Sequence, residues 1–208
     1  MSDATESVGA TPGGDTSGLI LTHLTTRADR DAAELDAIER AYKKHIDRAR
    51  RKKGGTEWLT DEYIRKVHRD MFGSIWAWAG QYRKDNLNIG VEWHRIPIEI
   101  KKLCGDFAYW NSSSSSMQIL EVAARLQHRL TFIHPFTNGN GRHARLITDI
   151  FLYSRKHLTP KWPQIQFMPQ GHEVRNRYIT AMKKADQGEF GDLVRFMEDY
   201  LKEHTEDG

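Results

Sequence analysis

The chain has 208 residues, with 31 Lys or Arg and 28 Asp or Glu, so its formal net charge is +3. No apolar run approaches the roughly 20 residues that a membrane-spanning helix needs. The first residues also lack the basic and then apolar stretch of a secretory signal. One cysteine, Cys104, is too few for an internal disulfide or a cysteine-based zinc site. We therefore expect a soluble cytoplasmic protein with no membrane contact and, at this small net charge, no direct nucleic acid binding.

Residues 1–18 are small and polar and hold almost nothing that a core could bury, so we expect a disordered N-terminal tail. Beyond it, Thr26 is a suitable N-cap for a helix. Apolar residues then recur at helical spacing: Leu35, Ile38, Tyr42 and Ile46. A basic run ends at Gly54 and Gly55, which predict the helix stop. We interpret residues 19–57 as an N-terminal helical extension.

Residues 58–204 are expected to form the core domain, and most of it has helical periodicity. The predicted helices lie around residues 61–71, 120–133, 146–151, 174–182 and 190–201. Asp61 and Glu62 open the first of these, where the helix dipole favours negative charge. The expected fold class is therefore all-α, a helical bundle.

One segment departs from helical spacing. After a turn signal at Asp85 and Asn86, apolar residues alternate at period two: Leu87, Ile89, Val91 and Trp93. This pattern predicts a short β-hairpin near residues 81–93. A lone two-stranded hairpin is marginal and needs a surface to lie on. Its exposed edge can also accept the backbone of another chain.

The most informative stretch is residues 134–145, HPFTNGNGRHAR, between two amphipathic segments. Gly139 and Gly141 permit positive φ and a close approach of the backbone. Successive N–H groups that lead into a helix N-terminus form an anion-binding site. Arg142 and Arg145 are three residues apart, so they share one helix face and offer planar donors to phosphate oxygens. The pattern predicts a loop that binds a polyphosphate.

Other residues of this stretch have separate predicted roles. His134 can move a proton near pH 7 and is the candidate base. We expect Phe136 to point into the core and anchor the loop, which leaves His134 facing outward. Asn140 can either orient the loop or donate to a phosphate. The alternative interpretation is an ordinary Gly/Asn turn with surface arginines, but so many functional residue types within twelve positions favour a site.

This stretch resembles the signature of the Fic family, His-x-Phe-x-Asp/Glu-Gly-Asn-Gly-Arg-x-x-Arg. The matching residues are His134, Phe136, Gly139, Asn140, Gly141, Arg142 and Arg145. The resemblance extends over about residues 58–202, through Trp76–Arg83, Asn88–Gly90 and Tyr178–Asp186. Within the family, Gly18–Arg27 is similar to the opening of a subgroup of small bacterial proteins called mobile mystery protein B.

The resemblance implies an enzyme that transfers AMP from ATP, with Mg²⁺, to a Tyr, Thr or Ser hydroxyl of a protein. It implies His134 as general base and residues 139–145 as the anion hole. It places the target protein on a flap formed by Asp85, Asn86, Leu87, Asn88, Ile89 and Gly90. Candidates for an adenine pocket are Tyr178 and Asn176, with Arg175 beside them. The subgroup further implies a helix-turn-helix partner that acts like an antitoxin.

Asn138 departs from the signature, because the family carries Asp or Glu there as a Mg²⁺ ligand. Mg²⁺ prefers anionic oxygens. We therefore expect weaker metal affinity, with the phosphates of ATP holding most of the ion. Two alternatives stay open: a Fic-like enzyme that transfers another nucleotide or a phosphate group, and a non-catalytic relative that binds a nucleotide or a peptide.

Many Fic proteins are inhibited by a helix with the motif Ser/Thr-x-x-x-Glu-Gly/Asn, whose Glu pairs with the second signature arginine. No full match occurs in this sequence. The nearest candidate is Glu34, with Arg30 and Leu35 at the flanking motif positions. The alternative interpretation is that Glu34 only solvates a helix face.

Overall fold

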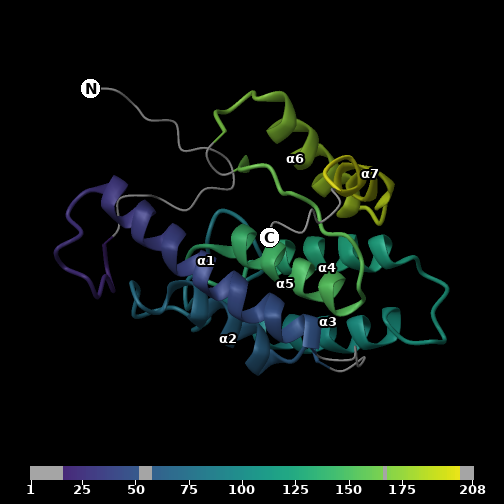
Figure 1. The fold of residues 1–208 in the computed structure, drawn as a ribbon, viewed down its shortest axis with the longest axis horizontal. Helices are drawn as coiled ribbons and strands as arrows, with labels where there is room; N and C mark the ends of the chain where they lie inside the picture. Colours follow the sequence, from purple (N-terminus) through teal and green to yellow (C-terminus); the bar gives the residue numbers. More distant parts are fainter. Residues whose placement is uncertain (1–15, 52–57, 166–167, 202–208) are drawn as a thin grey trace.

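The computed structural model describes residues 16–51, 58–165 and 168–201, and these residues are mostly helical (Figure 1). Their helices are α1 (Arg27–Arg51), α2 (Asp61–Phe72), the 3-10 helix η1 (Trp93–Arg95), α3 (Ile96–Trp110), α4 (Ile119–Ile133), α5 (Asn140–Ser154), α6 (Glu173–Ala185) and α7 (Gly191–Asp199). The all-α prediction is confirmed. Of the predicted tail, residues 1–15 lie outside the described residues, as does the predicted helix stop at residues 54–55. Within the described ranges, no helix is both long and apolar enough for a bilayer crossing.

Helix α1 begins as predicted, with Thr26 as its cap. The Thr26 hydroxyl accepts the Asp29 N–H at 3.1 Å, and the Asp29 carboxylate accepts the Thr26 N–H at 3.2 Å, a reciprocal capping arrangement. The buried face consists mainly of small residues, which let α1 lie directly on α2 and α5: Ala37, Ala41, Ile46 and Ala49. Leu35, which the pattern assigned to the apolar face, is instead 58% exposed.

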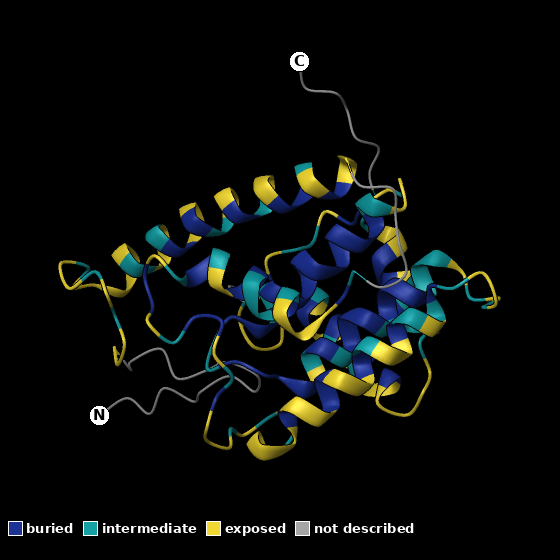
Figure 2. Ribbon diagram, turned by 90° about the horizontal axis from the view of Figure 1, so that it is seen from below, coloured by how far each residue is buried: buried dark blue, intermediate teal, exposed yellow. Residues whose placement is uncertain are grey.

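Helices α4 and α5 form the centre of the molecule. Helix α5 packs against α1, α2 and α4, while α3, α6 and α7 pack against α4. Figure 2 shows buried residues on the inward sides of the helices and exposed residues on their outer sides. The signature loop joins α4 to α5, so it lies where the two most central helices meet. This placement gives the loop a rigid support on both sides.

Helix α3 is a helix that the sequence analysis missed, although its signal is present. The fully buried residues Ile96, Ile100, Leu103 and Phe107 follow helical spacing. Pro97 lies in the first turn, where a missing N–H costs no hydrogen bond. The period-two pattern that ends at Trp93 obscured this start.

The predicted β-hairpin at residues 81–93 is wrong, because this segment contains no paired strands. Its backbone bonds instead to residues at the end of α4 and just after it. The Arg83 N–H donates to the Pro135 carbonyl at 3.0 Å, and the Val91 N–H donates to the Ile133 carbonyl at 3.4 Å. A two-stranded ladder is marginal on its own. Here the two limbs of the segment, which contain Arg83 and Val91, each bond to the backbone around the end of α4 rather than to each other.

Candidate active site

A cleft with a volume of about 980 Å³ lies between α1, the 85–90 segment, the start of α5 and α6. The residues of the signature that line it are His134, Asn138, Gly139, Asn140, Gly141, Arg142 and Arg145. Glu34 and Tyr178 line the same cleft from α1 and α6. The tertiary structure thus brings most of the predicted site residues into one cavity.

His134 ends α4 in the left-handed conformation, with φ 51°, which is uncommon for a residue with a Cβ. Its Nδ1 lies 3.2 Å from the Thr131 carbonyl. Because a carbonyl can only accept, Nδ1 carries the proton and Nε2 is left as the basic nitrogen. Burial lowers the pKa of His134 to about 4, so the ring is neutral at pH 7.

His134 is only 6% exposed, so the expectation that it faces outward is wrong. Gly90 covers it, with φ +94°. A Cβ at position 90 would lie 2.6 Å from the Cβ of His134 and 3.1 Å from the Ile133 carbonyl. Only glycine allows this approach. The 85–90 segment therefore lies directly over the candidate base.

Arg83 fixes the 85–90 segment from beneath. Its Nε donates to the His134 carbonyl at 2.8 Å, its Nη1 donates to the Asp85 carbonyl at 2.7 Å, and its Nη2 donates to the Val91 carbonyl. One buried guanidinium thus joins both limbs of the segment to the candidate base. It replaces the ladder that the sequence analysis predicted, and burial lowers its own pKa.

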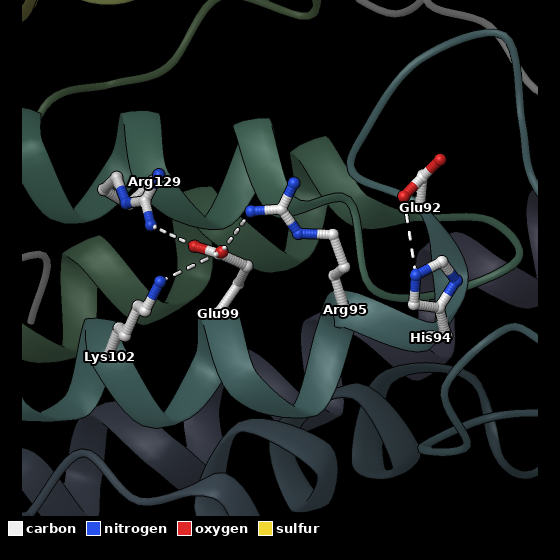
Figure 3. A network of polar contacts seen from close by, with 6 residues as sticks. All are labelled: Glu92, His94, Arg95, Glu99, Lys102 and Arg129. Atoms are coloured by element: carbon white, nitrogen blue, oxygen red, sulfur yellow. Dashed lines mark hydrogen bonds and ion pairs between the residues drawn. The ribbon is translucent and has the colours of Figure 1, made fainter.

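The helices η1 and α3, which follow the segment, are joined to α4 by the buried carboxylate of Glu99 on α3 (Figure 3). It accepts from Arg129 on α4 at 2.9 Å, from Arg95 of η1 at 3.1 Å and from Lys102 at 3.5 Å. Burial alone would raise the pKa of Glu99, but the nearby cations outweigh it and lower the pKa. The network therefore ties η1 and α3, which follow the segment, to α4.

Asn140 closes the signature loop. Its Oδ1 accepts the Phe136 N–H at 2.9 Å and its Nδ2 donates to the Phe136 carbonyl at 2.8 Å. Of its two predicted roles, the structure shows loop orientation. Phe136 is fully buried, and Gly139, with φ +77°, lies so close to Phe72 that a Cβ would be 2.5 Å from the ring. The loop is therefore packed against α2.

The two signature arginines differ in their surroundings. The Arg142 Nη1 lies 2.6 Å from the Glu34 Oε2, and its guanidinium lies 4.9 Å from the centre of the Phe72 ring. Arg145 is 9% exposed, and burial lowers its pKa. Both line the cleft within the first two turns of α5. Arg142, in the first turn, places a cation where the helix dipole is also positive.

Glu34 is 5% exposed, so the interpretation that it solvates a helix face is wrong. Besides the Arg142 contact, its Oε1 accepts the Trp76 indole N–H at 2.7 Å. Glu34 therefore pairs with the first signature arginine, whereas the family resemblance implied the second. The carboxylate therefore occupies one of the cationic donors of the cleft.

Asn138 lines the cleft, and its Oδ1 accepts the N–H of Gly139 at 2.6 Å. Over the described ranges, no group of three His, Cys, Asp or Glu side chains could hold a metal ion. A neutral oxygen already engaged by a backbone donor is a poor Mg²⁺ ligand. The side chains here therefore do not by themselves form a magnesium site.

Helix α6 contributes the remaining wall. Tyr178 is buried, and its hydroxyl accepts from the Gln127 Nε2 at 2.9 Å. Asn176 is exposed, donates to the Gly171 carbonyl at 3.1 Å and does not line the cleft. The helical period explains this, because Arg175 and Met182, three and four residues from Tyr178, share its face and line the cleft, whereas Asn176 is two residues away. Sequence reasoning missed Met182, which that period identifies, and Ile179, which also lines the cleft.

The flap residues that line the cleft are Asp85, Leu87, Asn88, Ile89 and Gly90. Asn86 instead stabilises the segment, since its Oδ1 accepts the Trp93 N–H at 3.0 Å.

One further acidic residue lies on α5, a turn beyond Arg145. Asp149 is 3% exposed and accepts the Trp162 indole N–H at 2.8 Å, and burial raises its pKa to about 8.

Comparison with known proteins identifies the family and the folds that this chain is similar to. The Fic/DOC family profile matches residues 58–152, which include the whole signature loop. Over these residues, a little under half of its length, the chain is similar to the Fic domain family. It is 28% identical over 144 residues to the protein adenylyltransferase Fic of Drosophila virilis, which covers 68% of this chain and 28% of that protein. The chain thus spans less than a third of the curated relatives it matches.

Solved structures show the same fold. Fic-1 from C. elegans has a TM-score of 0.65 at 23% identity, over 94% of this chain and 55% of that one. The BepC protein of Bartonella tribocorum, a translocated effector with bound AMPPNP, has a TM-score of 0.53 at 18% identity, over 82% of this chain and 87% of that one. At such identities the likeness concerns the fold.

Proposed function

We propose that this chain transfers AMP from ATP to a Tyr, Thr or Ser hydroxyl of a protein. The observation that carries the proposal is that His134 shares one cleft with the signature loop and has its basic Nε2 left available by the Nδ1 contact to Thr131. Relatives named protein adenylyltransferase support the activity, and the AMPPNP bound to BepC supports an adenine nucleotide as donor.

In the proposed step, the Nε2 of His134 takes the proton from the target hydroxyl. The hydroxyl oxygen forms a bond to the α-phosphorus of ATP, and the bond from that phosphorus to the oxygen bridging to the β-phosphate breaks. Pyrophosphate leaves, and AMP remains esterified to the protein. A hydroxyl is a weak nucleophile without such a base, which contributes about 10²–10⁴-fold.

The loop supplies electrostatic stabilisation. The N–H groups at the start of α5, together with Arg142 and Arg145, offer donors to the charge that develops on the phosphates. The Asn140 contacts to Phe136 hold the loop and the N–H groups that follow it before any ligand arrives, and Glu34 holds Arg142. Preorganised donors of this kind lower the barrier, because they need no reorientation during the reaction.

We propose that the 85–90 segment presents the target. It lies over His134, and Arg83 joins its two limbs to the His134 carbonyl. A target backbone that pairs with this segment would bring its hydroxyl to His134. A helix-turn-helix partner and the exact target remain predictions from the family resemblance.

We further propose that Glu34 restrains the site. Its carboxylate holds Arg142, so a nucleotide phosphate must displace it to use that arginine. Mg²⁺, which the family resemblance implies, would arrive with the nucleotide phosphates, because Asn138 adds no charge. Asn138 also favours the second candidate function, a relative that binds a nucleotide but transfers no group.

The deciding experiment incubates the protein in bacterial lysate with ATP labelled at the α- or the γ-phosphate. α-label on proteins that is lost in His134→Ala, but kept in a control such as His23→Ala at an exposed histidine outside the cleft, supports AMP transfer. γ-label indicates phosphate transfer. ATP binding without label indicates the non-catalytic relative.

A further inference from the structure

His68 on α2 contacts the signature loop from the side opposite the cleft. It is fully buried and does not line the cleft. Its Nε2 lies 3.0 Å from the carbonyl oxygen of Asn138, and its ring stacks on Phe136 with centroids 3.7 Å apart and planes 21° apart. The loop residue at the metal-ligand position of the signature is therefore held by its backbone, from behind.

The protonation of His68 follows from its second partner. The Gly80 N–H donates to the Nδ1 of His68 at 3.0 Å. A backbone N–H can only donate, so Nδ1 is the acceptor and Nε2 carries the proton that is donated to Asn138. Gly80 is itself fixed, since its carbonyl accepts from Arg65 at 3.0 Å. The imidazole thus bridges two fixed backbone groups in one tautomer.

The Asn138 contact sets the direction of a whole peptide group. The carbonyl of Asn138 and the N–H of Gly139 belong to one planar trans peptide, so they point in opposite directions. With the carbonyl directed at His68 in the interior, the Gly139 N–H points toward the cleft. There it meets the Oδ1 of Asn138, which lines the cleft. A rotated peptide would turn this donor away from a phosphate.

We propose that His68 is a positioning residue for phosphate binding, which acts by holding the Asn138–Gly139 peptide with its N–H toward the cleft. This inference rests on the proposed function, since it assumes that the loop binds the phosphates of a nucleotide. His68 contacts no substrate and moves no proton. It acts through the loop backbone and through the Trp76–Gly80 turn that fixes its ring.

Three substitutions separate the parts of this role. His68→Gln keeps a donor near the Nε2 position, His68→Asn keeps an acceptor near the Nδ1 position, and His68→Phe keeps only the ring on Phe136. The matched control is His45→Gln, because His45 is equally buried, with contacts to Tyr63 and Asp70 at 2.9 Å, and lies outside the cleft lining. The control reports the general cost of altering a buried histidine.

The measurement is the affinity for ATP and for adenosine, by calorimetry with EDTA present and again with Mg²⁺. We expect His68→Asn and His68→Phe to weaken ATP binding by about 10–100-fold, the range for a lost hydrogen bond to a charged group. Adenosine binding should change less than about threefold, because adenosine carries no phosphate. His68→Gln should retain most of the preference for ATP, and His45→Gln should retain all of it.

Different results overturn different statements. If His68→Asn and His68→Phe fold and keep the wild-type preference for ATP over adenosine, or if His68→Gln loses as much of it as they do, His68 does not position the loop. If the wild type prefers ATP and the variants His68→Asn and His68→Phe lose this preference, but the wild type transfers no label, the positioning role stands and AMP transfer is rejected. If the wild type itself shows no preference for ATP, the phosphate site and the inference both fail.

Discussion

The contact between Glu34 and Arg142 gives the most direct test of restraint at this site. Both side chains are largely withdrawn from solvent, at 7% and 21% exposure, and their charged atoms are 2.6 Å apart. Glu34→Gly removes the carboxylate, so that a nucleotide phosphate no longer has to displace it. Glu34→Gln removes the charge but can still accept the Trp76 indole N–H.

The magnitude follows from this one contact. A hydrogen bond between charged groups contributes about 1.5–3 kcal/mol, and each 1.4 kcal/mol is a factor of ten. We therefore expect ATP affinity, and AMP transfer at low ATP, to rise roughly 10–100-fold in Glu34→Gly. The same variant should unfold more easily, because a mid-helix glycine costs about 1 kcal/mol and the Trp76 N–H loses its acceptor.

The assay combines ATP binding with incorporation of α-label, for wild type, both Glu34 variants and Asp36→Gly. Asp36 lies on the same helix and, among the residues that the structure describes, forms an ion pair with the exposed Arg40 alone. Its variant therefore has the same mid-helix glycine without altering a partner of Arg142. If Glu34→Gly binds ATP no better than Asp36→Gly, the carboxylate does not restrain the site. A gain shared by both glycine variants would assign the effect to a loosened α1.

Three further predictions concern metal and pH. Asn138→Asp should lower the Mg²⁺ concentration that half-saturates labelling by about tenfold, because it adds an anionic oxygen; an unchanged Mg²⁺ titration would exclude a ligand role at this position. Asp149 has a folded pKa of about 8, above its ordinary value of 3.8, so the stability it contributes is lost as the pH rises between these values. Asp149→Asn can still accept from the Trp162 indole N–H. Its free energy of unfolding in urea should therefore exceed that of the wild type by a margin that grows toward pH 9 and is absent near pH 4. Burial lowers the pKa of His134 and His143 from 6.5 to about 4, so the unfolded chain binds more protons in this range. In the Asp149→Asn background, each of these two histidines should lower the free energy of unfolding by up to about 3 kcal/mol as the pH drops from 6.5 to 4. A free energy of unfolding, measured in urea, that does not change over this pH range would contradict the conclusion that both are buried in the neutral form.

Local sequence was sufficient for most helices and for the signature loop. The cap at Thr26 and the apolar spacing of α2, α4 and α5 depend on neighbours within a few residues, so a single chain segment carries the information. The same holds for the signature, because its base, glycines and arginines all lie within residues 134–145. Their proximity needs no knowledge of the remaining fold.

Only the tertiary structure decided how other segments complete the site. Glu34 meets Arg142 across 108 residues, and His68 meets Asn138 across 70. Neither pairing has a local signal, because each depends on how α1 and α2 pack against the start of α5. The 81–93 segment shows the same limit: its alternation was compatible with a hairpin, but its donors found the α4–α5 connection instead. Long-range packing, not local spacing, therefore determines what covers His134 and what holds the loop.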